Sequence, residues 1–122
     1  MISYTLVNAV LTSMKIMTDE EIKSAETICK AVCSEFSKKL RKLEYNSEDA
    51  VLSACAAMVY FKFVVAQGLK SDNYTSFKAG DIKVTQSYSA RLESATIYRD
   101  DALLSAAPYL KDVDFVFRMV NV

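Results

Sequence analysis

Residues 50–67 read AVLSACAAMVYFKFVVAQ, and this stretch decides the fold. It is apolar on almost every side of a helix, and Lys62 is its only charged residue. A helix that is apolar all round lies either in the centre of a protein or in a membrane. A membrane span needs about 20 predominantly apolar residues and is commonly flanked by basic residues, whereas this run is shorter and has no such flank. The stretch therefore predicts the central helix of a soluble core.

Two amphipathic helices are predicted before this core helix. Residues 4–17 place apolar side chains three and four positions apart, which is typical of one helix face (Leu6, Val7, Val10, Leu11, Met14 and Met17). Thr18 and Glu21 then have the spacing of a capping box, so a second helix is expected to begin there. Its apolar positions continue as far as residue 43 (Ile22, Ala25, Cys29, Val32, Cys33, Phe36, Leu40 and Leu43).

The core helix has recognisable start and stop signals, and an unusual segment follows it. Residues 46–47, Asn and Ser, favour a helix N-cap, and Gly68 is the expected residue just past the helix end. Residues 69–89 then have strand-like sequence around Gly80 and Asp81. Connections longer than about 12 to 15 residues are uncommon unless they bind, close a site or are disordered. We therefore expect an extended arm at residues 69–89 that carries the function.

A further helix and a short strand are predicted after the arm. Apolar residues recur at helical spacing until Pro108, which ends or kinks the helix (Ala90, Leu92, Ala95, Tyr98, Ala102, Leu103 and Ala106). Residues 115–120 read FVFRMV and predict a strand, whose natural partner is the segment 82–85. The predicted fold is mainly α: residues 1–122 form one domain of four helices, with a small β element near residues 77–85 and 115–120.

Composition and charge limit the possible partners and location. In 122 residues, 15 basic residues balance 15 acidic ones, so no global field favours a nucleic acid or an anionic membrane. We therefore expect no membrane partner and no sequence-specific nucleic-acid partner. Three cysteines, an odd number, are typical of reduced thiols in the cytoplasm, and residues 1–17 lack the pattern of a signal peptide.

The residues usual in catalysis and metal binding are sparse. Histidine is absent, which removes the commonest general base and most catalytic zinc sites. Cys29 and Cys33 stand one helical turn apart, but a tetrahedral site needs four ligands and Cys55 is the only other cysteine. These thiols are predicted to be small buried hydrophobes. We predict no cofactor, no metal and no enzymatic activity.

Four aspartates are the alternative, as a catalytic set that would work with a divalent ion. Asp100 and Asp101 are adjacent on a predicted helix and so point in different directions, which favours solvated surface. Asp112 and Asp114 flank the last predicted strand and are read as a turn and a charged strand edge. The spacing gives no convergent site.

The arm supplies the candidate interaction residues. Its aromatic side chains either pack back on the chain's own helices or anchor a partner, and the sequence leaves both readings open. Residues 77–85 would form a strand edge able to pair with a neighbouring chain, unless residues 115–120 cover that edge. A glycine and an aspartate in the middle favour a turn. The candidate interaction residues are Tyr74, Phe77, Lys78, Gly80, Asp81, Ile82, Val84 and Tyr88.

A family resemblance gives these residues a more specific meaning. Residues 76–84 read SFKAGDIKV, residues 107–110 read APYL and residues 114–117 read DFVF. With the helical layout of nearly the whole chain, these segments resemble small phage and prophage head–tail connector proteins, also called adaptor or head-completion proteins. The resemblance implies a structural subunit that forms a ring between portal and tail, assembled in the host bacterial cytoplasm and carried in the virion. It implies that residues 74–88 contact a neighbouring copy, the portal or a tail-completion protein.

A helical module of another kind is the alternative. A dimeric regulator in the cytoplasm would pair through the apolar face of the first or second helix, because an exposed apolar face marks an interaction site. It would form a stable twofold dimer and no ring.

Overall fold

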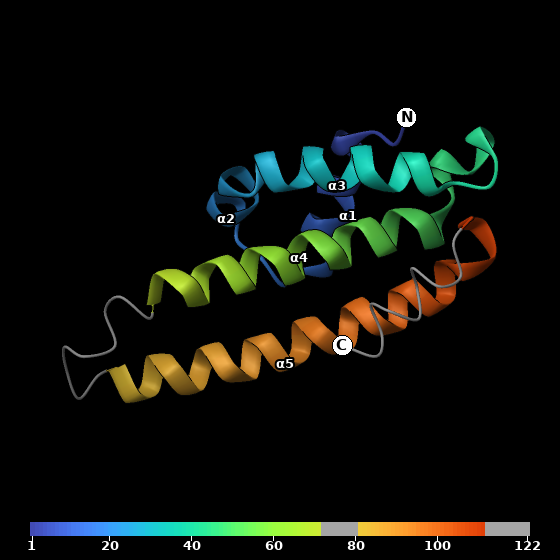
Figure 1. Cartoon of the computed structure of the whole chain (residues 1–122). Helices are drawn as coiled ribbons and strands as arrows, with labels where there is room; N and C mark the ends of the chain where they lie inside the picture. Colours follow the sequence, from blue (N-terminus) through green and yellow to red (C-terminus); the bar gives the residue numbers. More distant parts are fainter. Residues whose placement is uncertain (72–80, 112–122) are drawn as a thin grey trace.

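The computed structural model describes residues 1–71 and 81–111, with side chains described for residues 1–68 and 88–111. These residues are mainly helical (Figure 1), which confirms the predicted fold class. The helices are α1 (Tyr4–Met14), α2 (Asp19–Ser24), α3 (Glu26–Lys39), α4 (Asp49–Ser71) and α5 (Asp81–Ala106). Two short 3₁₀ turns complete the order, η1 (Leu43–Ser47) and η2 (Ala107–Tyr109).

The central helix is α4, as the apolar stretch predicts. It contacts α1, α3 and α5, and α3 and α5 lie on opposite sides of it (Figure 1). Its fully buried side chains include Val51, Met58, Val59 and Val64. By length and composition, Asp49–Gly68 is apolar enough to cross a membrane, with a mean hydropathy of 1.7. The core helix of a soluble protein gives the same signal, and 61% of this stretch is buried inside the protein.

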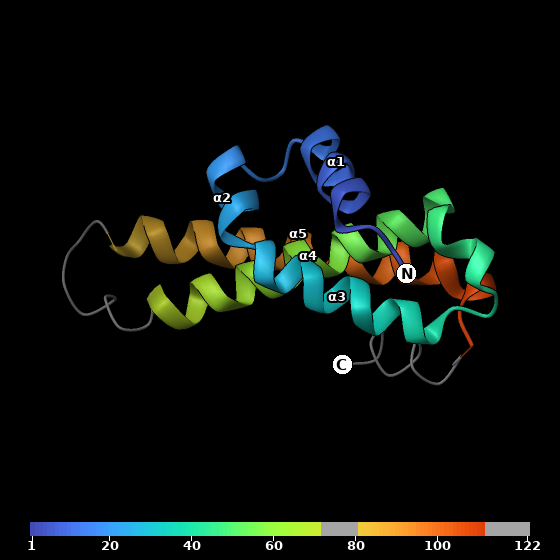
Figure 2. The ribbon, with the colours of Figure 1, turned by 90° about the horizontal axis from the view of Figure 1, so that it is seen from above.

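The N-terminal helices cover one side of the core. Figure 2 shows α1 and α2 together along one long side of α3 and α4. The side chains of Val7 and Leu11 on α1 are completely buried. The helix ends at Met14, earlier than predicted, because Lys15 adopts a left-handed backbone conformation with φ of 57°. Such a conformation commonly ends a helix.

The predicted capping box is confirmed at the start of α2. The amide of Glu21 donates to Thr18 Oγ1 at 3.1 Å, and the amide of Thr18 donates to Glu21 Oε1 at 3.0 Å. The single helix predicted from residue 18 to residue 43 is instead two helices. They meet at Ala25, whose φ and ψ of −88° and 8° interrupt the helical path.

The helices α4 and α5 form a long antiparallel hairpin, and this corrects the predicted arm. α4 continues past Gly68 to Ser71, and α5 begins at Asp81. The extended arm predicted at residues 69–89 is therefore wrong for 69–71 and 81–89, and residues 72–80 lie outside the described part. The strand predicted at 82–85 is also wrong, because these residues are helical. Its predicted partner, residues 115–120, lies outside the described residues.

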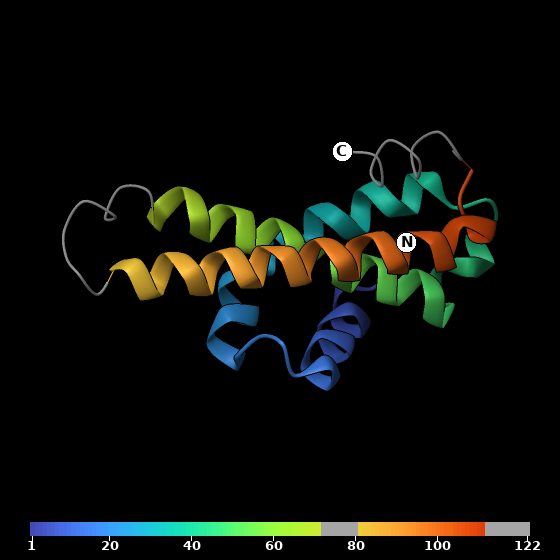
Figure 3. The ribbon, with the colours of Figure 1, turned by 90° about the horizontal axis from the view of Figure 1, so that it is seen from below.

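Packing explains this error better than local preference does. Strand preferences are small and depend on context, and helices in proteins gain most of their stability from burying an apolar face. α5 lies along nearly the whole of α4 (Figure 3) and buries Ala95, Leu103 and Ala106. The first turns of α5 extend this same helix toward the end of α4, so residues with strand preference follow the helical path.

At the other end of the hairpin, a short main-chain pairing joins the end of α3 to the segment after α5. Leu40, just after α3, pairs with Leu110, just after η2, in an antiparallel bridge. The amide of Arg41 donates to the Tyr109 carbonyl at 2.9 Å, and the Arg41 Nε donates to the Leu110 carbonyl at 2.6 Å. The predicted helix end near Pro108 is confirmed, because α5 stops at Ala106 and the proline lies in η2.

Candidate interaction site

The structure places four of the eight predicted interaction residues in the first turns of α5. Asp81, Ile82 and Val84 lie in the first turns of α5, where the backbone is helical and forms no strand edge. Tyr88 lies one to two turns further along the same helix. The remaining predicted interaction residues lie outside the described part of the chain (Tyr74, Phe77, Lys78 and Gly80).

Tyr88 packs back on its own chain. Its side chain is half-buried against the core and reaches the backbone of Gly68 on α4. A Cβ at Gly68 would fall on the Oη, Cζ and Cε1 atoms of Tyr88. Gly68 is therefore a point of close approach between α4 and α5 rather than the helix end that the sequence predicts. For Tyr88, the structure therefore favours packing on the chain's own helices over anchoring a partner.

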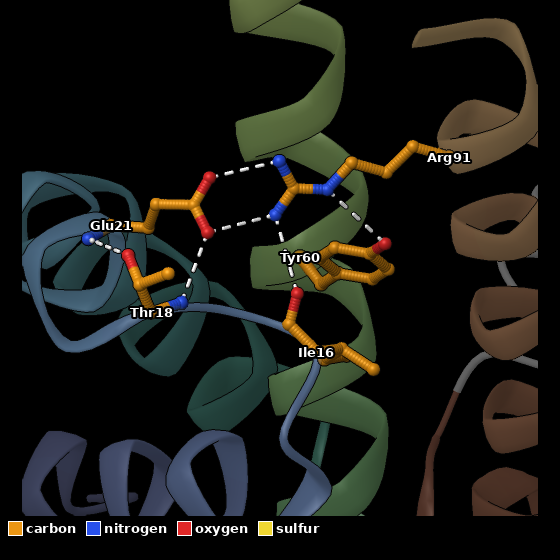
Figure 4. Close-up of polar contacts among 5 residues, drawn as sticks. All are labelled: Ile16, Thr18, Glu21, Tyr60 and Arg91. Carbon is orange, nitrogen blue, oxygen red and sulfur yellow. Dashed lines mark hydrogen bonds and ion pairs between the residues drawn. The ribbon is translucent and has the colours of Figure 1, made fainter. Parts of the chain in front are cut away.

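A cluster around Arg91 joins α5 to the start of α2 (Figure 4). The guanidinium donates to both carboxylate oxygens of Glu21, at 2.8 Å to Oε2 and 3.0 Å to Oε1. It also donates to the Ile16 carbonyl at 3.3 Å and to the Tyr60 hydroxyl at 3.4 Å. Bidentate pairs of this kind are stronger and more directional than simple ion pairs. We call these residues, with Thr18, the Arg91 cluster.

The charges of this cluster stabilise each other. The hydrogen bond from Arg91 holds the pKa of Glu21 below its ordinary value of 4.5, and the hydrogen bonds with Thr18 act in the same direction. The hydrogen bond to Glu21 likewise raises the pKa of Arg91. Both side chains are mostly buried, at 30% exposed for Arg91 and 24% for Glu21. Both groups are charged at neutral pH and hold each other in place. The cluster is therefore a structural ion pair, and neither group is free to act as an acid or a base.

A second arginine is buried on α5. Arg99 is 5% exposed, and its guanidinium lies 4.3 Å from the centre of the Phe61 ring on α4. Its Nη2 lies 2.8 Å from Asp100 Oδ1, and its Nε donates to the same oxygen at 3.0 Å. The prediction that Asp100 is solvated surface is therefore wrong, since Asp100 neutralises a buried cation. Asp101 is exposed, as predicted.

Among the described side chains, the titratable groups do not converge on a catalytic arrangement. Within residues 1–68 and 88–111, no three His, Cys, Asp or Glu side chains are placed to hold a metal ion. Asp112 and Asp114, the other half of the alternative carboxylate set, lie outside the described residues. The expectation of no enzymatic activity stays a prediction.

The three cysteines are buried and unpaired, as predicted for small hydrophobes. The neighbouring Cys33 thiol and burial together raise the pKa of Cys29. Burial alone is the main cause that raises the pKa of Cys55. Neutral thiols are poor nucleophiles, so these two cysteines are structural.

The outer side of α5 carries a surface that the sequence analysis missed. Large apolar side chains are exposed there, at 62% for Ile97, 43% for Tyr98 and 53% for Leu104. Ser94, Ile97, Tyr98 and Asp101 line a shallow open hollow of about 200 Å³. We call this surface, with Glu93, the α5 outer face. The sequence does carry a signal for this surface. Ile97 and Leu104 lie on a different side of the helix from the apolar stripe of Ala95 and Leu103, so the helix has two apolar sides.

A comparison of the chain with protein-family models, with curated proteins and with solved structures found no match.

Proposed function

We propose that this chain is a structural subunit that works by binding other protein chains, as a ring-forming head–tail connector of a phage or prophage. The observation that carries the proposal is the exposed apolar surface of α5. Its outer face presents Ile97 and Leu104 to solvent, although α5 already buries its opposite side against α4. A helix that is apolar on two sides commonly lies between two partners.

The connector assignment adds a sequence resemblance to this surface. The resembling segments are residues 76–84, 107–110 and 114–117. Within them, residues 81–84 belong to α5, so the end of the first segment is helical and forms no strand. The contact surface proposed for the ring therefore moves from an extended arm to the α5 outer face.

The alternative is a twofold helical dimer, and the structure narrows where it could pair. Most of the apolar residues predicted for the first helices are buried inside the chain, including Val7, Leu11, Cys29, Val32 and Phe36, whereas Leu6 and Leu43 are exposed. A dimer would therefore pair mainly through another surface, and the α5 outer face is available.

Native mass spectrometry over a concentration series separates these proposals. A ring subunit is expected to give one large closed species, with few intermediates, as concentration rises. A dimer that is stable at all concentrations would favour the regulatory module instead. A chain that stays monomeric at high concentration would contradict a ring built by self-association.

The mass measurement needs an arm variant that leaves α5 intact. Deleting residues 74–88 would remove the start of α5 and Tyr88, so loss of the oligomer would be hard to interpret. Deleting residues 74–79 leaves Asp81–Ala106 whole. If the ring survives this deletion, the contacts of the ring lie in the helical body.

A further inference from the structure

We propose that the α5 outer face binds the corner around Leu43 of a second copy of this chain, in a head-to-tail contact. This inference rests on the proposed self-assembly and names the two surfaces that meet. One surface is apolar with an acidic rim, and the other is apolar with basic neighbours.

The acidic partner is the α5 outer face. Ile97 and Leu104 lie two turns apart on one side of the helix, about 10 Å along its axis. Glu93 and Asp101 are exposed on this side of the helix. Among the described side chains of α5, the two cations are engaged elsewhere, Arg91 with Glu21 and Arg99 with Asp100. The surface is therefore apolar and negatively charged.

The hollow in this face suits one aliphatic side chain. Its volume is about 200 Å³ and it is open to solvent, so an aliphatic side chain of another chain can enter it. Tyr98 forms one wall and is held by an edge-on contact with Tyr60, with ring centres 6.3 Å apart. Asp101 lines the hollow from the polar side. A leucine side chain would contact the apolar part of the hollow, and a cation beside that leucine would lie near Asp101.

The basic partner is the corner where α3 gives way to η1. Leu43 is 77% exposed there, the most exposed of the large apolar side chains described. Arg41 and Lys42 directly precede it and are exposed, although the Arg41 Nε also donates to the Leu110 carbonyl. Exposed Glu44 directly follows it, so two cations and one carboxylate leave this corner with a net positive charge. Lys42 lies 3.9 Å from Glu44, but both side chains are more than 60% exposed, so this pair is weak. We call Arg41, Lys42 and Leu43 the Leu43 corner.

Charge decides that the contact is head to tail and not twofold. A twofold pair of α5 outer faces would bring the carboxylates of two copies together, and a twofold pair of Leu43 corners would bring the cations together. Like charges across an interface are costly, whereas opposite charges favour association and fix the register. A contact between two different surfaces leaves one of each free on every dimer, so it continues into a closed ring or a filament.

Complementary single variants test the contact. Leu43→Glu and Leu104→Glu each remove one surface, and each is expected to be monomeric by native mass spectrometry. Mixed in equal amounts, they are expected to form a heterodimer that grows no further, because only one intact pair of surfaces remains. Ala31→Glu, at an exposed position on α3, is the matched control and should assemble like the unchanged chain. Circular dichroism and thermal unfolding verify that each variant is folded.

Charge reversal gives an independent test. Lys42→Glu and Asp101→Lys should each weaken self-association about tenfold or more, and the double variant should restore it. If the chain forms rings that neither leucine variant disturbs, the contact is wrong and the proposed function stands. If either leucine variant alone forms a homodimer, the contact is twofold and the inference is overturned. If the unchanged chain never self-associates, both the contact and the self-assembling ring are overturned.

Discussion

Arg91 on α5 binds both carboxylate oxygens of Glu21 on α2, at 2.8 and 3.0 Å, across 70 positions of sequence. Glu21 also completes the capping box with Thr18, so one carboxylate both caps the start of α2 and binds Arg91 of α5. The guanidinium lies 5.4 Å from the Tyr60 ring centre on α4. The Arg91 cluster thus ties three helices together where the loop from α1 meets α2.

Arg91→Ala is expected to destabilise the fold by about 2 kcal/mol, since hydrogen bonds to charged groups contribute more than neutral ones and the aliphatic stem also packs. Arg91→Lys should recover only part of this, because an ammonium lacks the planar fork that binds both oxygens. Urea denaturation measures both. Lys23→Ala, which removes a cation from the exposed surface of α2, is the control and should change the free energy of unfolding by less than about 0.5 kcal/mol. Equal effects of Arg91→Ala and Lys23→Ala would contradict the structural role of the cluster.

The ion pair between Arg91 and Glu21 predicts that the stability of the fold depends on pH. The pKa of Glu21 is lower in the folded state than its ordinary value of 4.5. Its stabilising contribution is therefore complete above pH 4.5 and is lost as the pH falls through the lowered pKa. Glu21→Gln should melt at a lower temperature than the unchanged chain at pH 7, and the difference should shrink between about pH 4.5 and pH 2. A difference that stays constant over this range would show that Glu21 does not act through its charge.

Replacement by asparagine should affect the stability of the fold differently at the two adjacent aspartates of α5. Asp100 pairs with buried Arg99, whereas Asp101 is exposed. Asp100→Asn leaves a buried cation without its counter-ion and is expected to cost about 2 kcal/mol, less than for a fully buried pair because Asp100 keeps some contact with water. Asp101→Asn is the matched control and should be within about 0.5 kcal/mol of the unchanged chain. Thermal unfolding of the two variants under the same conditions decides between them, and a larger loss for Asp101→Asn would contradict the pairing.

The buried cysteines predict slow thiol chemistry. Cys29, Cys33 and Cys55 are all buried, and the pKa values of Cys29 and Cys55 are raised. In the native protein, a water-soluble disulfide reagent should modify them only as fast as the fold opens, and in guanidinium it should modify all of them at once. Rapid modification of one thiol in the native protein would show that its surroundings open to solvent.

Local signals in the sequence predict the parts of this fold that depend on neighbouring residues. The capping box needs only Thr18 and Glu21, three positions apart, and the structure has both of its hydrogen bonds. The apolar stretch at 50–67 predicts a buried central helix because burial follows from composition alone. The end of α5 follows from Pro108, whose ring cannot continue a helix.

The arm prediction is wrong for residues 69–71 and 81–89 because their structure depends on distant residues. Gly68 is typical of a helix end, but here Tyr88 occupies the space beside it and α4 continues. Residues 82–85 have strand preference, yet they extend a helix whose later turns are fixed against α4. Arg91 gives no local signal that its partner is Glu21. Such contacts become visible only when α5 is placed along α4.

Gly68 offers a direct test of how closely α4 and α5 pack. Alanine normally stabilises a helix by about 1 kcal/mol relative to glycine, but here its Cβ would collide with the Tyr88 ring. Gly68→Ala is therefore expected to destabilise the fold by about 1 kcal/mol, since Tyr88 is half-buried and must shift to make room. In a chain that already carries Tyr88→Ala, the same change should stabilise by close to the helix value, because the space is free. Chemical denaturation of the four chains measures the coupling between the two positions. If Gly68→Ala stabilises equally in both backgrounds, the ring does not occupy this space in solution, and the hairpin is looser than the structure describes.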